Sequence, residues 1–263
     1  MHRGTWARVA AMTILLAGTP VDELGAQQLE QRIAGIGDGR VLFAFAARPG
    51  VCGDGYNIST GDDGCWSRTS DDGTRLRRLA AGPIRVTLTI RDQQVVSLRT
   101  VVGGDSGLRE GVIDLGRVST QEASHYLLSL AERGEGRVGG EAIVPAVLAD
   151  SVTVWPRLVT LARNERLPRS TRETATLWLG FAAADVIDPG DGETTEADEP
   201  REQAVFALSQ LPRDQAVPSL IQVARTHRSP AIRRRAIFWL SQRLDERGIN
   251  LMEEVLKASP RRE

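Results

Sequence analysis

The sequence predicts a mainly α-helical fold, in which an α-solenoid of helix pairs follows a small antiparallel β domain with one disulfide. Residues 155–163 and 217–225 carry nearly the same text, and a second motif occurs three times within residues 172–242. Two helical motifs in a period of about 31 residues are typical of stacked helix-pair arrays. Residues 41–102, by contrast, contain short stretches in which apolar and polar residues occupy alternate positions. Such alternation is typical of half-buried strands.

Length and composition indicate a packed protein that is long enough for two domains. The chain has 263 residues, of which 41% are hydrophobic and 25% charged, as in an ordinary globular protein. We expect a signal peptide over residues 1–26, a β-rich domain over 27–118 and a helical repeat domain over 119–263. The net charge of -1 argues against nucleic acid as the partner, because nucleic-acid-binding proteins usually carry a basic surplus.

The N-terminus has the features of an export signal. Arg3 and Arg8 make the start positive, residues 9–17 form an apolar run, and Ala26 is a small residue suited to cleavage before Gln27. The run is too short to cross a bilayer, and no other stretch reaches about 18 apolar residues. The sequence therefore predicts an exported protein, periplasmic or secreted, without a transmembrane segment.

Export would determine the oxidation state of the two cysteines, Cys52 and Cys65. An oxidising compartment favours a disulfide between them, and two free thiols are the alternative. The loop between them is rich in Gly and Asp and contains few apolar side chains that could be buried. Its closure would stabilise the fold by about 3 kcal/mol in the chain-entropy model.

The β domain is expected to begin with a short helix over residues 28–34 and to continue with strands. One strand has Val41, Phe43 and Phe45 on one face, and a second has Ile84, Val86, Leu88 and Ile90 facing inward with Arg85, Thr87, Thr89 and Arg91 on the opposite face. After a turn, the return strand over 94–102 places Val96, Leu98 and Val102 inward. Three strands are few, so we expect this sheet to lean on a helix or on the repeats.

The helical half begins at a capping pattern, Ser119 with Glu122 three residues on. A further helix follows over 140–149. The repeat helices are expected near residues 155–166, 171–184, 200–211, 217–227, 231–243 and 248–258. Pro156 and Pro218 fall where the first turn of a helix tolerates proline.

The repeat helices carry a pattern of small and large residues that indicates close packing between neighbours. It consists of Ala204, Phe206 and Leu208 in one copy and of Ala236, Phe238 and Leu240 in another. We expect Trp178 and Trp239, which occupy equivalent positions, to be core residues. An acidic insertion over residues 185–200 interrupts the repeats and is expected to be a solvated loop. Its spacing does not match a calcium-binding loop.

Residues with catalytic chemistry are scarce. Beyond the signal peptide the histidines are His125 and His227, and neither has a carboxylate or thiol at metal-ligand spacing. The chain has no zinc-protease, nucleophile-elbow or P-loop motif. The acids of the Gly/Asp-rich region are Asp54, Asp62, Asp63, Asp71 and Asp72. Turn formation accounts for them better than a metal site does. We therefore expect no catalytic residue, no metal and no cofactor.

The best candidate for partner binding is a cluster of arginines around one turn between helices, namely Arg225, Arg228, Arg233 and Arg234, with Arg235 beside them. Consecutive arginines at a helix start oppose the helix dipole, so a compensating charge is expected. One interpretation is internal pairing with the acidic insertion or with Glu202, Asp214 and Glu173. The other is an acidic surface of a second protein, held by the guanidinium groups.

The repeats resemble HEAT repeats, in particular the short HEAT-like form of phycobilisome lyases. The resemblance rests on residues 218–224 and 230–240, where P-x-L-I-x-V-A precedes a prolyl turn and I-R-x-x-A. It implies a non-catalytic scaffold or adaptor that binds another protein. The alternative functions are an enzyme, lyase-like or hydrolytic, with a site between the β domain and the solenoid, and a structural envelope component that associates with itself. The sequence predicts neither the partner's identity nor the oligomeric state.

Overall fold

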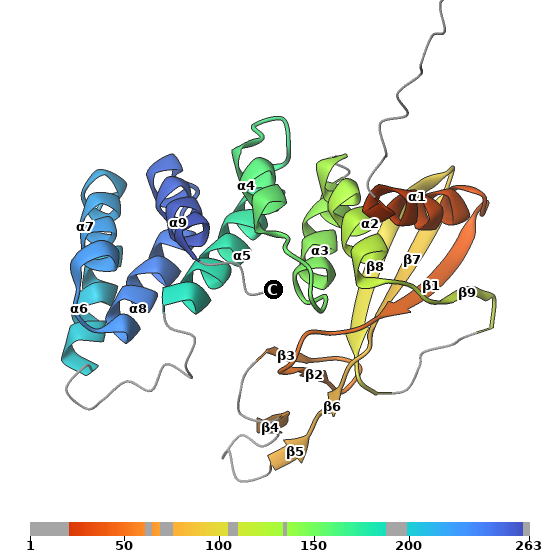
Figure 1. Ribbon diagram of the computed structural model, residues 1–263, viewed down its shortest axis with the longest axis horizontal. Coiled ribbons are helices and arrows are strands. Elements are labelled where there is room, and N and C mark those ends of the chain that lie inside the picture. Colours follow the sequence, from red (N-terminus) through yellow and green to blue (C-terminus); the bar gives the residue numbers. More distant parts are fainter. Residues whose placement is uncertain are drawn as a thin grey trace, which may run out of the picture.

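The computed structural model describes residues 21–60, 65–68, 76–104, 110–133, 136–187 and 199–259 (Figure 1). Residues 1–20, which hold most of the expected signal peptide, lie outside this part of the chain. Helix α1 (Val21–Ala34) is longer than expected and runs through the expected cleavage point after Ala26. In the part of the chain that the structure describes, no helix is both long and apolar enough to cross a membrane.

A four-stranded sheet follows α1, in the order β8-β7-β1-β9. Its strands are β1 (Gly39–Phe45), β7 (Ile84–Arg91), β8 (Gln94–Val102) and β9 (Val112–Arg117). The three expected strands are confirmed, and they pair antiparallel. The expectation of a purely antiparallel sheet is wrong, because β9 pairs parallel with β1. β9 went unpredicted because it lies at an edge, where its residues show no alternation of burial.

The return strand β8 faces the core through a different set of residues than expected. Leu98 and Val102 are buried, but Val95 is buried in place of Val96, which is 48% exposed. The register of β7 and β8 shifts between Thr89 and Ile90, so that Thr89 faces Ser97 while Ile90 faces Val95. The extra residue in β8 is a bulge, and a bulge moves the following side chains to the other face.

Helices cover one face of this sheet, as expected. Phe43 and Phe45 of β1 are buried there with Leu29 of α1, and the Phe43 ring meets the Tyr126 ring of the next helix edge-on at 6.3 Å between centroids. The Arg48 N–H donates to the Leu148 carbonyl at 2.9 Å, which ties the chain after β1 to the helical half. The sheet and the helices consequently share one hydrophobic core.

Two smaller sheets lie beyond the end of β1. One joins β3 (Ile58–Thr60), β2 (Val51–Gly53) and β6 (Ala80–Ala81), and the other joins β4 (Trp66–Arg68) and β5 (Leu76–Arg78). The expected disulfide is confirmed: Cys52 of β2 is bonded to Cys65, just before β4, with 5.5 Å between their Cα atoms. These strands are too short for a sequence period to reveal.

Eight further helices are described after the sheet. They are α2 (Thr120–Glu132), α3 (Gly136–Val147), α4 (Trp155–Arg163), α5 (Arg169–Ile187), α6 (Glu199–Ser209), α7 (Arg213–Thr226), α8 (Pro230–Ser241) and α9 (Glu246–Ala258). The expected capping box at Ser119 and Glu122 is confirmed. Pro156 lies in the first turn of α4 as expected, whereas Pro218 lies inside α7, because that helix already begins after Pro212.

The helices from α4 onward form two layers. Figure 1 shows α4, α9 and α7 in the upper layer and α5, α8 and α6 in the lower one. Within the lower layer α8 packs between α5 on one side and α6 on the other, and in the upper layer α9 contacts both α4 and α7.

This order differs from the order of the chain. A sequential array would place α6 and α7 directly against α4 and α5, but α8 and α9 occupy that position. The burial of side chains gives the reason. Helix α8 buries residues on two sides, including Ile232, Ala236 and Ile237, and can be covered from both directions. Helix α6 has one buried apolar residue, Val205, and therefore suits an end of the layer.

The small-large pattern is thus correct for α8 and wrong for α6. Ala236 and Leu240 are fully buried, but Phe206 is 49% exposed and Ala204 is exposed. The two helices share a motif and differ in environment, because among the described helices α6 has a neighbour in its own layer on one side only.

Candidate interaction site

The arginine cluster gathers at the N-terminal half of α8, and most of its members have partners within the chain. Arg225 of α7 pairs with Glu254 of α9 at 2.6 Å. Arg233 donates to the His227 carbonyl at 3.2 Å. Arg228 is exposed and has no hydrogen bond or ion pair with a described residue.

Two arginines of the cluster join neighbouring helices of the lower layer. Arg234 lies 3.7 Å from Asp185 of α5, and Arg235 lies 2.7 Å from Glu202 of α6. The interpretation of internal pairing is therefore correct for Glu202 and for Asp185, the first residue of the acidic insertion. Of the other expected partners, Glu173 pairs with Arg169, a residue of its own helix.

An aromatic surface adjoins these arginines on the outer side of the lower layer. It consists of Trp178 and Phe181 of α5, Phe206 of α6, and Phe238 and Trp239 of α8. Successive ring centroids along Trp178, Phe181, Phe238, Trp239 and Phe206 are 5.1–6.3 Å apart. Phe181 is 37% exposed and Phe206 is 49% exposed. The other three residues are partly buried, so the five form a contiguous, partly exposed apolar surface. Such a surface is typical of a binding site.

The expectation that Trp178 and Trp239 are core residues is correct in part. Both pack against the core, but neither is fully buried. The indole N–H of Trp239 is buried without a hydrogen-bond partner among the described residues. The sequence contained a signal for this surface, because Arg234, Arg235 and Phe238 are spaced three and four apart and so share one side of a helix.

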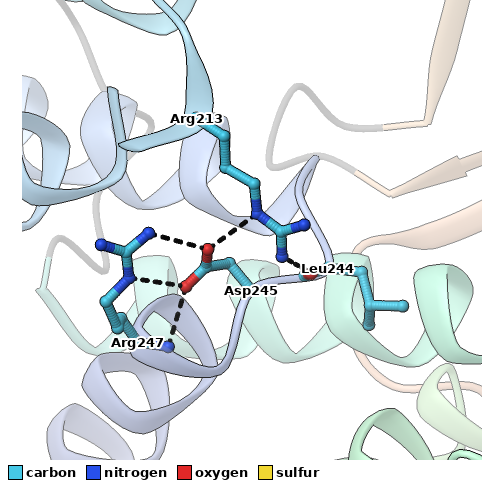
Figure 2. A network of polar contacts seen from close by, with 4 residues as sticks. All are labelled: Arg213, Leu244, Asp245 and Arg247. Carbon is cyan, nitrogen blue, oxygen red and sulfur yellow. Dashed lines mark hydrogen bonds and ion pairs between the residues drawn. The ribbon is translucent and has the colours of Figure 1, made fainter. Parts of the chain in front are cut away.

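Ion pairs hold the upper-layer helices that support this surface. Arg163 of α4 reaches Glu246 and Glu253 of α9, at 2.7 Å in each case. Figure 2 shows a second junction, where Arg213 of α7 and Arg247 of α9 approach the Asp245 carboxylate from two sides. Arg213 also donates to the Leu244 carbonyl.

Asp245 is the centre of that junction and caps α9. Its side chain is 8% exposed and accepts from the Arg247 N–H at 3.0 Å. The hydrogen bond from the Arg247 guanidinium, helped by that from Arg213, lowers the pKa of Asp245 from 3.8 to about 2, against the opposing effect of burial. A charged, buried and fully bonded residue of this kind fixes the position of α7 relative to α9.

His125 lies beside a hollow of about 190 Å³ between α2 and the start of α4. The other lining residues include Gln121, Ser124, Thr153 and Arg157, and none is a carboxylate. The Ser124 hydroxyl donates to the Ala146 carbonyl at 3.3 Å and does not approach a base. The hollow therefore gathers no pair of groups suited to acid-base or nucleophilic chemistry.

Of the acids weighed as metal ligands, Asp54 is described, while Asp62, Asp63, Asp71 and Asp72 lie outside the described residues. The Asp54 carboxylate accepts from the backbone N–H groups of Tyr56 and Asn57 at 2.9 and 2.8 Å. Hydrogen bonds from an Asp side chain to nearby backbone N–H groups are typical of a turn. Among the residues that the structure describes, no group of three possible metal ligands occurs.

Comparison of the chain with protein-family models, with curated proteins and with solved structures finds no match.

Proposed function

We propose that the protein is an exported, non-catalytic scaffold of HEAT-like helix pairs, an α-solenoid in which α8 and α9 are stacked out of chain order, and that it binds another protein through the outer side of α5, α8 and α6. The exposed aromatic surface carries the proposal. Trp, Phe and Arg are enriched where binding energy concentrates in protein interfaces. Here the rings of three helices form one surface, and Arg234 and Arg235 adjoin it.

The partner is a protein whose contact surface is apolar with an acidic border. Among the residues that the structure describes near the N-terminal half of α8, Arg228, Arg233, Arg234 and Arg235 are accompanied by two carboxylates, those of Asp185 and Glu202. This surplus of positive charge complements acidic residues. The helix-joining ion pairs support the same function, because a rigid surface loses less entropy when it binds.

The alternative of an enzyme with a site between the sheet and the helices has less support. The described hollow between the sheet and the helices is lined by Gln93 and Gln94 and by Tyr126 and Arg133. Its one carboxylate among the described residues, that of Glu30, forms an ion pair with Arg133 at 2.7 Å. Export is supported by the N-terminal charge and apolar run and by the Cys52–Cys65 disulfide, which suits an oxidising compartment. Mass measurement of protein from the periplasm or the medium tests export, because processing would remove residues 1–26.

The proposed function is tested by capture from an envelope extract, followed by direct binding to the protein recovered. The bait is the tagged chain, compared with a variant carrying Phe181→Ser and Phe206→Ser and with one carrying Arg233→Glu and Arg234→Glu. We expect the wild type to recover a partner and the aromatic variant to bind it at least about tenfold more weakly, since two exposed interface rings are lost.

A matched control carries Val96→Ser and Ile113→Ser, which removes apolar side chains of similar exposure, 48% and 46%, from the sheet. This control is expected to bind as the wild type does. Equal binding by all variants would place the contact elsewhere, and recovery of no partner by the wild type would overturn the scaffold function. Thermal melts of each variant show whether it is folded.

A further inference from the structure

A second charged surface lies on the four-stranded sheet, where the strand register brings together four arginines from four strands. Residues that face each other across paired strands point to the same side of a sheet. Arg85 of β7 faces Ala44 of β1, and Arg99 of β8 faces Thr87 of β7. Arg40 faces Thr89, and Arg117 of β9 faces Ala44. Arg40, Arg85, Arg99 and Arg117, here called the sheet arginines, therefore share one face.

This face is the one that the helices leave uncovered. Along β7 the residues of the opposite face, Ile84, Val86 and Leu88, are completely buried, whereas those between them are partly exposed. Figure 1 places α1 and α2 together against one side of the sheet. The alternation of burial assigns the buried residues to that side and the sheet arginines to the other.

The sheet arginines lack carboxylate partners among the described residues. Arg40 donates to the Glu110 carbonyl and Arg85 to the Gly103 carbonyl, each at 3.3 Å. The Arg99 guanidinium lies 5.9 Å from the centre of the Tyr56 ring. The helical half behaves differently, since its arginines at α4, α7, α8 and α9 form ion pairs.

Within the four strands as described, one carboxylate belongs to this face. Asp114 of β9 faces Leu42 of β1, and its side chain accepts from the Gly116 N–H at 2.7 Å. It forms no ion pair with the described residues. The face thus retains a surplus of positive charge whose hydrogen-bonding capacity is mostly unused, because each guanidinium has five N–H donors.

From this arrangement we infer that the uncovered face of the sheet binds an acidic peptide segment, in addition to the site proposed on the helices. Guanidinium groups bind carboxylates through paired charge-assisted hydrogen bonds. Side chains on one side of an extended peptide recur every ~6.8 Å, and adjacent strands of a sheet are ~4.8 Å apart. An extended segment with acids at alternate positions therefore matches the distribution of the sheet arginines.

Other polyanions fit this face less well. The chain as a whole has a net charge of -1, so a long polyanion such as nucleic acid or an anionic membrane would also meet acidic surface. Single-stranded nucleic acid further requires a series of rings on which successive bases stack, whereas Tyr56 beside Arg99 is the one aromatic residue that a described contact places at this face. A short acidic segment needs only the patch itself, which is ~14 Å across the four strands.

The test measures binding of a short fluorescent peptide in which Glu alternates with Ser, by anisotropy at low and at high salt. We expect salt-sensitive binding by the full chain and no binding of the same peptide with Gln in place of Glu. Arg85→Gln with Arg99→Gln should weaken binding about tenfold or more, since both lost contacts are charge-assisted.

The matched control carries Arg137→Gln and Arg169→Gln. These arginines are 90% and 79% exposed, and each pairs with a glutamate of its own helix, so the net charge changes equally while the sheet is untouched. Affinity equal to wild type is expected for this control. The inference is overturned if the sheet variant binds like the wild type, if both variants lose affinity equally, or if a DNA oligonucleotide or anionic vesicles bind the sheet more tightly than the peptide.

Discussion

Gly180 of α5 lies so close to Ser241 of α8 that a side chain on Gly180 would overlap the Ser241 Cβ, with the Ser241 Oγ at 2.6 Å. The Met252 sulfur of α9 would lie 3.4 Å away. This contact holds α8 and α9 against α5, in the place that a sequential array would give to α6 and α7.

Replacing Gly180 by alanine should destabilise the protein by about 1–3 kcal/mol, because the added methyl group overpacks a tight contact. Alanine favours a helix by about 1 kcal/mol over glycine, so the loss reflects packing. Urea denaturation measures the effect, and Ser241→Gly in the same chain should restore part of it. Gly140→Ala is the control: its nearest atom would be the Thr174 Oγ1 at an ordinary 3.7 Å, and it should not destabilise. A neutral Gly180→Ala would contradict the observed contact.

Asp245 should make the stability of the folded protein depend on pH in the acidic range. Its pKa of about 2 in the folded protein is below the ordinary 3.8, so the unfolded chain takes up the proton first as the pH falls. The stabilisation is complete above about pH 4 and is lost toward pH 2, and it amounts to about 2 kcal/mol. We expect Asp245→Asn to be less stable than wild type at pH 6 and the gap to narrow by about that amount near pH 2. Parallel stability curves for the two proteins would refute this role.

Leu220 of α7 is fully buried, and Leu220→Asp should unfold the helices around it, because an unpaired charge would be buried between them. The loss should exceed about 4 kcal/mol. Leu211→Asp serves as the control, since Leu211 is 36% exposed and should tolerate the charge. Circular dichroism on heating distinguishes the two. A Leu220→Asp variant that melts like the wild type would mean that α7 packs through other residues.

The disulfide should stabilise the small sheets measurably. Cys52 and Cys65 are separated by 13 residues, and closing a loop of this length contributes about 3 kcal/mol in the chain-entropy model. Cys52→Ser should lower the midpoint of urea denaturation, and a reductant should lower that of the wild type in the same way. The reductant should have no effect on the Cys52→Ser variant. An unchanged wild-type midpoint under reduction would show that the loop adds nothing to global stability.

The sequence identified the strands and helices that have one buried side, because burial on one side imposes a period of two or 3.6 residues. Strands β1, β7 and β8 and the helices of the repeats are of this kind. Strand β9 and the short strands around Cys52 show no such period. The bulge in β8 was also invisible, since Val95 and Val96 are the same residue type and the register decides which of them is buried.

The candidate sites were harder to predict, because they depend on neighbours distant in the chain. Arg233, Arg234 and Arg235 stand out in the sequence because they are consecutive. Asp185 and Glu202, which pair with two of them, come from two other helices. The sheet arginines come from four separate strands and meet only through the register. The sequence predicted part of this surface, because the alternation of β7 places Arg85 and Arg91 on the face opposite the core.

The position of α8 and α9 between the other helix pairs has a consequence for how the protein is made. A ribosome releases α6 and α7 before α8 and α9, so the newly synthesised pair has no completed neighbour to dock on. The apolar sides of α5 and of α6–α7 stay uncovered until α8 and α9 have been synthesised. Whereas a sequential repeat protein can fold one repeat at a time from its N-terminus, this protein completes its helical half from the middle. A chain terminated before Pro230 would leave both flanking pairs exposed to aggregation.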